Sequence, residues 1–282
     1  MITTELVHEV RQRLGNRTDI NDARIIRWLN WAMLDLCGFN RQRVFPSVWF
    51  HELEDQMLIT VNPITGEVQD VDDDRIQLEV SNLTAASFVD SVIRVGGTDR
   101  LITNYDGAWA WIDPVEPEVE IGDGYSVHFR SPLLSAINID MVSNVWAILE
   151  MEIASTGTTL EHVEWKELKG LSPTQIGTPQ KYARHGNRIL FDVAPAVRTA
   201  FRAFVYKFPA QLRESEPNRE TDLPDQWDEV VVQGAVWRGF EALMEPERAM
   251  EAFEQFKSAA TNRNSSYAVE APSVRRSFKV RS

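Results

Sequence analysis

The sequence is poor in the residues on which many activities depend. Cys37 is the single cysteine among 282 residues, so an internal disulfide and a cysteine metal cluster are both excluded. The sequence contains no Walker loop, no G-x-G-x-x-G and no G-x-S-x-G motif. The histidines show neither HxxxH nor HxH spacing and read as structural residues: His8, His51, His128, His162 and His185. We therefore name no catalytic, cofactor-binding or metal-binding residue and expect a protein that is not an enzyme.

Basic residues and long apolar runs are also scarce. Lys and Arg total 29 against 42 Asp and Glu, which gives a formal net charge of -13. Proteins that read nucleic-acid sequence usually carry a basic domain, so this balance argues against such a reader. No apolar run approaches the roughly 18 residues that cross a bilayer. The start, Met1-Ile2-Thr3-Thr4-Glu5, lacks the basic and apolar regions of a signal peptide. We expect a soluble protein made in a cytoplasm, with no membrane partner.

One acidic cluster, Asp70-Val71-Asp72-Asp73-Asp74, invites a calcium interpretation. A calcium loop of the EF-hand type that began at Asp70 would need glycine at its sixth position and glutamate at its twelfth. The sequence has Arg75 and Ser81 there, so we favour a solvated loop. Cys37 sits at a predicted helix end, where a small buried residue is favoured over a nucleophile.

Helical patterns occupy both ends of the chain. Residues 3–38 predict a helical hairpin, with Asn21 as the N-cap of its second helix and Gly15 and Gly38 as stops. Helical spacing returns at residue 222, and Pro246 opens the last helix. Two amphipathic pairs so far apart in the chain pack most simply on each other.

The middle of the chain is rich in strand patterns. Short alternating runs over residues 44–134 predict a small sandwich or barrel, with a hairpin turn at Gly96-Gly97. Residues 141–153 and 163–165 are further strand candidates, and 176–212 reads as three strands with turns at Gly177 and at Gly186-Asn187. The predicted fold is α+β: a helical bundle from the N- and C-terminal helices, a large β-rich insertion and an extended C-terminal tail. The expected segments are 1–43, 44–134, 135–221, 222–264 and the tail 265–282.

Tryptophans offer the clearest surface hypothesis. Trp109 and Trp111 share one strand face by parity. Such a pair stacks on sugars in carbohydrate-binding modules, but it is more often core or subunit interface. Trp227 and Trp237 on the next-to-last helix are further interface candidates. A hydrolase ranks last because no acid–base pair can be named.

Three stretches resemble a known family. The first contains Gly177-Thr178-Pro179, Tyr182, Gly186-Asn187, Pro195, Tyr206, Pro209 and Leu212. The second contains Leu223-Pro224-Asp225-Gln226-Trp227, Gly234-Ala235, Ala249 and Phe253. The third lies in the insertion, with Ile93-Arg94-Val95-Gly96-Gly97, Leu101-Ile102-Thr103 and Gly122-Asp123-Gly124-Tyr125. Together they resemble the head-to-tail adaptor proteins of tailed bacteriophages.

The resemblance implies a structural virion protein at the head–tail junction. Such adaptors form a homo-oligomeric ring, usually twelve-fold, that contacts the portal and the next neck or tail protein. Double-stranded DNA would pass through the lumen without sequence-specific binding. The resemblance also implies that the basic tail docks on the portal through Arg275, Arg276, Phe278, Lys279, Val280 and Arg281. The alternatives are another neck or tail component, such as a stopper or tail-completion protein, and the carbohydrate-binding module.

Overall fold

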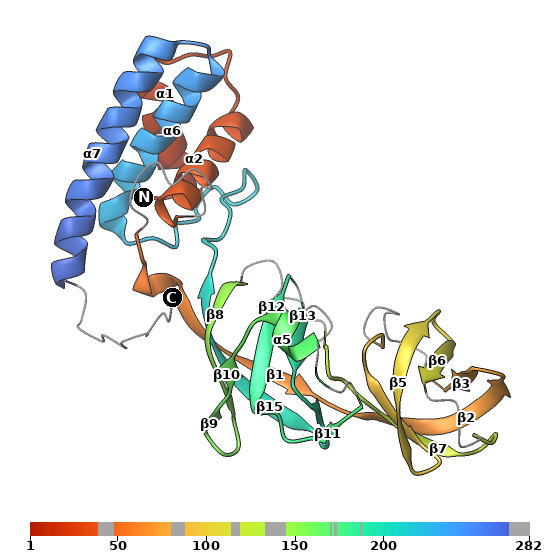
Figure 1. The fold of residues 1–282 in the computed structure, drawn as a ribbon. Helices are drawn as coiled ribbons and strands as arrows, with labels where there is room; N and C mark the ends of the chain where they lie inside the picture. Colours follow the sequence, from red (N-terminus) through yellow and green to blue (C-terminus); the bar gives the residue numbers. More distant parts are fainter. Residues whose placement is uncertain are drawn as a thin grey trace. The chain divides into compact units, whose positions relative to one another are not determined.

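A computed structural model describes residues 1–38, 48–79, 88–113, 119–132, 145–169, 171, 174–186 and 188–270 (Figure 1). The chain divides into two compact units: a helical unit, Met1–Glu54 with Lys207–Ser282, and a β unit, Asp55–Tyr206. The helical unit takes both ends of the chain, so the β unit is an insertion between them. The prediction of an α+β chain with helices at both ends and a β-rich middle is confirmed.

The helical unit contains α1 (Thr3–Arg13), α2 (Asp22–Leu36), α6 (Asp228–Ala242) and α7 (Pro246–Glu270), with short 3-10 helices η1 (His51–Leu53) and η3 (Asp225–Trp227). Local sequence rules place their ends. The Asn21 Oδ1 accepts a hydrogen bond from the Arg24 backbone N at 3.0 Å, which confirms the predicted cap. Gly15 follows α1 with a φ of 82°, and Pro246 is the first residue of α7.

Helix α6 packs against α1, α2 and α7. Two of its glycines permit this. A Cβ on Gly234 would lie 2.8 Å from the Ala32 Cβ, and one on Gly239 would lie 3.0 Å from the Leu14 methyl groups. Both close approaches occur inside one chain.

The first part of the β unit is a closed barrel with strand order β2-β3-β6-β5-β4-β7. The strands are β2 (Ile64–Asp72), β3 (Arg75–Leu78), β4 (Val92–Val95), β5 (Thr98–Tyr105), β6 (Trp109–Asp113) and β7 (Gly124–His128). Gly96 and Gly97, with φ of 59° and 78°, form the predicted turn between β4 and β5. Of the two alternatives, sandwich and barrel, the barrel is therefore the one that forms.

The rest of the β unit consists of smaller sheets. β1 (Glu54–Val61), β15 (Thr199–Lys207), β8 (Val145–Ile153) and β9 (Thr158–Thr159) form one sheet, and β10 (Glu161–His162), β12 (Lys181–His185) and β13 (Arg188–Phe191) a second. β11 (Ile176–Gly177) pairs with β14 (Ala194–Pro195). The strand predicted over 141–153 is confirmed from Val145 on, and 141–144 lie outside the described residues. The strand predicted at 163–165 is wrong: residues 163 and 164 belong to no strand, and Trp165 begins the short helix α5 (Trp165–Lys169).

Barrel and sheets share one apolar core. Val68 and Ile93 of the barrel belong to the same buried cluster as Met151, Phe191 and Phe201 of the sheets. A buried cation helps to join these parts. The Arg130 guanidinium donates from Nε to the Phe191 carbonyl at 3.0 Å and from Nη2 to the Leu168 carbonyl at 2.7 Å. Burial lowers its pKa.

No helix among the described residues is long and apolar enough to cross a membrane.

Candidate interaction surfaces

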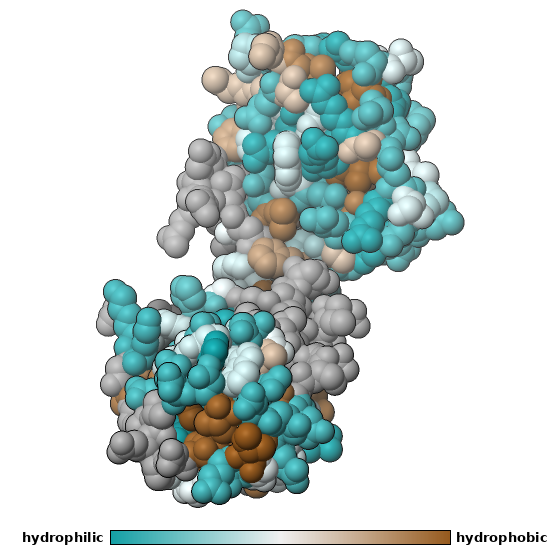
Figure 2. All heavy atoms as spheres, turned by 90° about the vertical axis from the view of Figure 1, so that its right-hand side faces the viewer, coloured by the Kyte–Doolittle hydropathy of each residue, from teal (hydrophilic) through white to brown (hydrophobic). Residues whose placement is uncertain are grey.

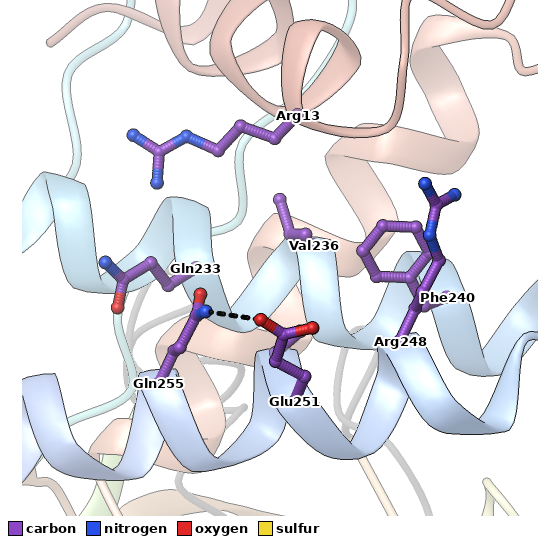
Figure 3. A pocket seen from close by; sticks show the side chains of 8 residues that line it. Arg13, Gln233, Val236, Phe240, Arg248, Glu251 and Gln255 are labelled. Carbon is purple, nitrogen blue, oxygen red and sulfur yellow. Dashed lines mark hydrogen bonds between the residues drawn. The ribbon is translucent and has the colours of Figure 1, made fainter.

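The helical unit carries a surface groove with a volume of about 280 Å³ (Figure 3). The groove lies where the C-terminal end of α1 meets α6 and α7. The last two helices run side by side because a short turn joins them. Its lining combines an apolar floor with a polar rim, and comprises Arg13, Gln233, Val236, Phe240, Arg248, Glu251, Ala252 and Gln255.

The charged groups of the groove are held by neighbours. Arg13 makes two hydrogen bonds to the Glu229 carboxylate, at 2.7 and 2.8 Å. The Gln255 amide donates to Glu251 at 3.4 Å, and Arg248 lies over the Phe240 ring at 5.3 Å from its centroid. None of these contacts joins a nucleophile to a base.

The part of the chain that the structure describes shows neither a group of metal ligands nor a reactive thiol. There, no group of three or more His, Cys, Asp or Glu side chains is placed to hold an ion. The acidic cluster spans the end of β2 and the turn to β3, where Asp72 pairs with Arg75 at 2.9 Å. Cys37 is 4% exposed, and burial raises the pKa of its thiol, so the reactive thiolate is disfavoured.

Trp109 and Trp111 lie on the outer face of β6, half-buried, while Ala110 and Ile112 between and beside them face the barrel core. Parity thus placed the pair correctly. The Arg75 guanidinium lies over both rings, at 4.9 Å from the Trp109 centroid and 5.5 Å from the Trp111 centroid. Sequence reasoning missed Arg75, which reaches the rings through its cross-strand pairing with Trp111. Because it covers a face of each ring, stacking on a sugar is disfavoured.

Trp227 and Trp237 are core residues. Trp227 is fully buried and meets the Phe50 ring edge to face at 5.0 Å. Trp237 is 7% exposed, with its ring 4.8 Å from that of Phe253 and 5.8 Å from that of Phe256. Both rings are buried within the helical unit of one chain, and the prediction that they face another subunit stays a prediction.

Comparison with known proteins bears on the chain as a whole. A family model described as SU10 adaptor protein matches residues 1–277. The chain belongs to this family of phage head-to-tail adaptors. No curated protein matches it. The match covers both units, so the resemblance seen in three short stretches is confirmed. The adaptor is accordingly a virion protein of a structural family.

The adaptor exposes several large apolar side chains. Figure 2 shows apolar side chains gathered on a face of the β unit, and Ile121, 67% exposed, lies on a turn of the barrel beside Gly122. In the helical unit, Trp31 is 46% exposed on α2 and Met250 is 71% exposed on α7. Apolar groups that gather on one face, as on the β unit, often mark contact surfaces. Sequence reasoning did not find them, since exposure depends on which helix face the neighbours cover.

The predicted docking tail of the adaptor stays largely untested. Helix α7 continues to Glu270, beyond the expected start of the tail at residue 265. The six residues named for portal docking, Arg275, Arg276, Phe278, Lys279, Val280 and Arg281, lie outside the described residues.

Proposed function

We propose that the adaptor assembles into a homo-oligomeric ring, twelve-fold as is usual for such adaptors, directly below the portal. The ring extends the DNA conduit of the head and attaches the next neck or tail protein. The observation that carries this proposal is the family match over residues 1–277. It includes both the helical unit and the inserted β unit, so the whole chain takes part in the adaptor architecture.

Charge supports a conduit role. The formal net charge is -13, and a lumen lined by acidic side chains repels the phosphate backbone of DNA. Double-stranded DNA then passes without adhering and without sequence-specific contacts. The division into two units supports a double attachment, because one unit can face the portal while the other faces the tail-side partner.

The C-terminal segment is the proposed contact with the portal. It follows α7 and carries Arg275, Arg276, Lys279 and Arg281, with Phe278 and Val280 between them. Deletion of residues 271–282 leaves α7 intact, so this truncation separates docking from folding. We expect the truncated adaptor to lose stable attachment to filled, tailless capsids. Replacement of the four basic residues by Gln should weaken attachment, whereas the same change at exposed Arg198 and Arg213 should not. Normal docking of the truncated chain would refute the tail assignment.

Electron microscopy of the assembled particle tests the position of the ring. An adaptor must touch the portal directly, so density for the adaptor should lie against the portal with no other protein between them. Density separated from the portal by another protein would show a stopper or tail-completion protein instead.

A further inference from the structure

Helix α2 presents a basic, aromatic outer face. Arg24, Arg27 and Trp31 are spaced i, i+3 and i+7, so they share one side of the helix, and all are exposed. Arg24 lies over the Trp28 ring at 5.4 Å from its centroid. Within the described part of the chain, neither Arg24 nor Arg27 makes an ion pair. Two unpaired arginines beside an exposed tryptophan stand out in a chain of net charge -13.

Helix α7 presents an acidic outer face with an exposed methionine. Glu247, Met250, Glu251 and Glu254 recur at helical spacing and are exposed. Their face is opposite the buried one, which contains Ala249, Ala252, Phe256 and Ala260. Among the described residues, the Glu251 carboxylate accepts a hydrogen bond from the Gln255 amide, and Glu254 is 4.0 Å from Lys257, which is half-buried. These carboxylates thus have capacity for further cations.

The two faces point to different sides of the helical unit. α2 and α7 both pack on α6, and Ala32 of α2 and Phe256 of α7 meet at Gly234. Figure 1 shows α7 along one side of the helical unit and α2 along the other, with α6 between them. Each face runs for about two turns, roughly 10 Å at 1.5 Å per residue. The faces match in length and in charge but cannot meet within one chain.

We propose that the α2 face of one copy docks on the α7 face of the next copy. Arg24 and Arg27 pair with the carboxylates of Glu247, Glu251 and Glu254, while Trp31 packs against Met250. Trp, Arg and Met are the residues enriched at interface centres, and a thioether packs well against an aromatic ring. Since the two faces differ, the contact is heterologous and repeats from copy to copy until a ring closes. This inference rests on the proposed ring and names the surfaces that build it.

Reciprocal charge reversal tests the pairing. One full-length variant carries Arg24→Glu with Arg27→Glu, and a second carries Glu247→Lys with Glu251→Lys. When either variant is the sole adaptor present, every interface brings like charges together. We therefore expect the number of adaptor copies per particle to fall by about tenfold or more. Co-expression of the two variants should restore assembly, because every α2 face then finds a complementary α7 face on a copy of the other type. A single chain with all four substitutions should also recover.

The control carries Arg198→Glu with Arg213→Glu, which changes the net charge as the α2 variant does, at exposed positions of other segments. It should assemble as the wild type does, and circular dichroism should show all variants folded. Normal assembly of either reversed variant, or no recovery on co-expression, would overturn the pairing while the wild-type ring stands. A wild-type particle with a single copy at the junction would overturn the proposed ring itself.

Discussion

Gly234→Ala tests the closest contact in the helical unit. The added Cβ would lie 2.8 Å from the Ala32 Cβ and 2.9 Å from the Phe256 Cε2. Ala32 is fixed to the α2 backbone and the Phe256 ring is fully buried, so neither atom can step aside. Helices must move apart, and such overpacking costs about 1–3 kcal/mol. Alanine regains up to about 1 kcal/mol of helix propensity over glycine. Because both neighbours are rigid, we take the overpacking cost at the upper end of its range. The free energy of unfolding should therefore fall by about 2 kcal/mol.

Gly239→Ala on the same helix is the matched comparison. Its nearest neighbours are the Leu14 methyl groups at 3.0 Å and the Trp28 Cζ3 at 3.3 Å. The end of a leucine side chain can rotate by a few tenths of an ångström, so the propensity gain should offset most of the cost. We expect a change within about 1 kcal/mol. Urea unfolding followed by the helical circular-dichroism signal compares both variants with the wild type. Equal effects, or a Gly234→Ala variant more stable than the wild type, would refute the argument from rigid neighbours.

Three further predictions each concern one side chain. Asn21→Ala should lower the free energy of unfolding by about 1 kcal/mol, because the Arg24 amide loses its side-chain acceptor. Arg130→Met should cost at least about 2 kcal/mol in urea unfolding, since two buried carbonyl oxygens lose their donor, whereas Arg130→Lys should cost less. Burial raises the pKa of Tyr182 to about 12, against about 10 for a free tyrosine, so its contribution to stability is complete below pH 10 and is lost between pH 10 and 12. The part of the tyrosinate absorbance that the wild type shows and Tyr182→Phe lacks should appear only as the pH approaches about 12.

Features that depend on a few neighbouring residues were predictable. Asn21, Gly15 and Pro246 mark helix ends through hydrogen-bonding capacity and backbone freedom that belong to the residue itself. The Gly96-Gly97 turn is equally local, because the I′ type of turn needs positive φ at both positions. Strand alternation in the insertion likewise reflects a period of two in the sequence.

Features that depend on distant contacts were not predictable in this way. The barrel closes through β2 and β7, where Ile64 pairs with Val127, and alternation alone does not specify such partners. Trp237 and Trp109 look alike as aromatic residues at regular spacing, yet one ring is enclosed by phenylalanines and the other faces outward under Arg75. Which face of an element its neighbours cover decides between core and contact surface.

The same reasoning explains why net charge alone is a poor guide to how copies of this adaptor associate. A formal charge of -13 predicts that copies repel one another. The helical unit, however, distributes its charges unevenly. Arginines near α1 and α6 are paired inside the chain, as Arg13 with Glu229 and Arg238 with Asp35 show. Among the residues that the structure describes, Arg24 and Arg27 of α2 make no ion pair, and the carboxylates of α7 can take further cations. In the proposed ring, a chain polarised in this way would attract its own copies in one orientation despite its net negative charge.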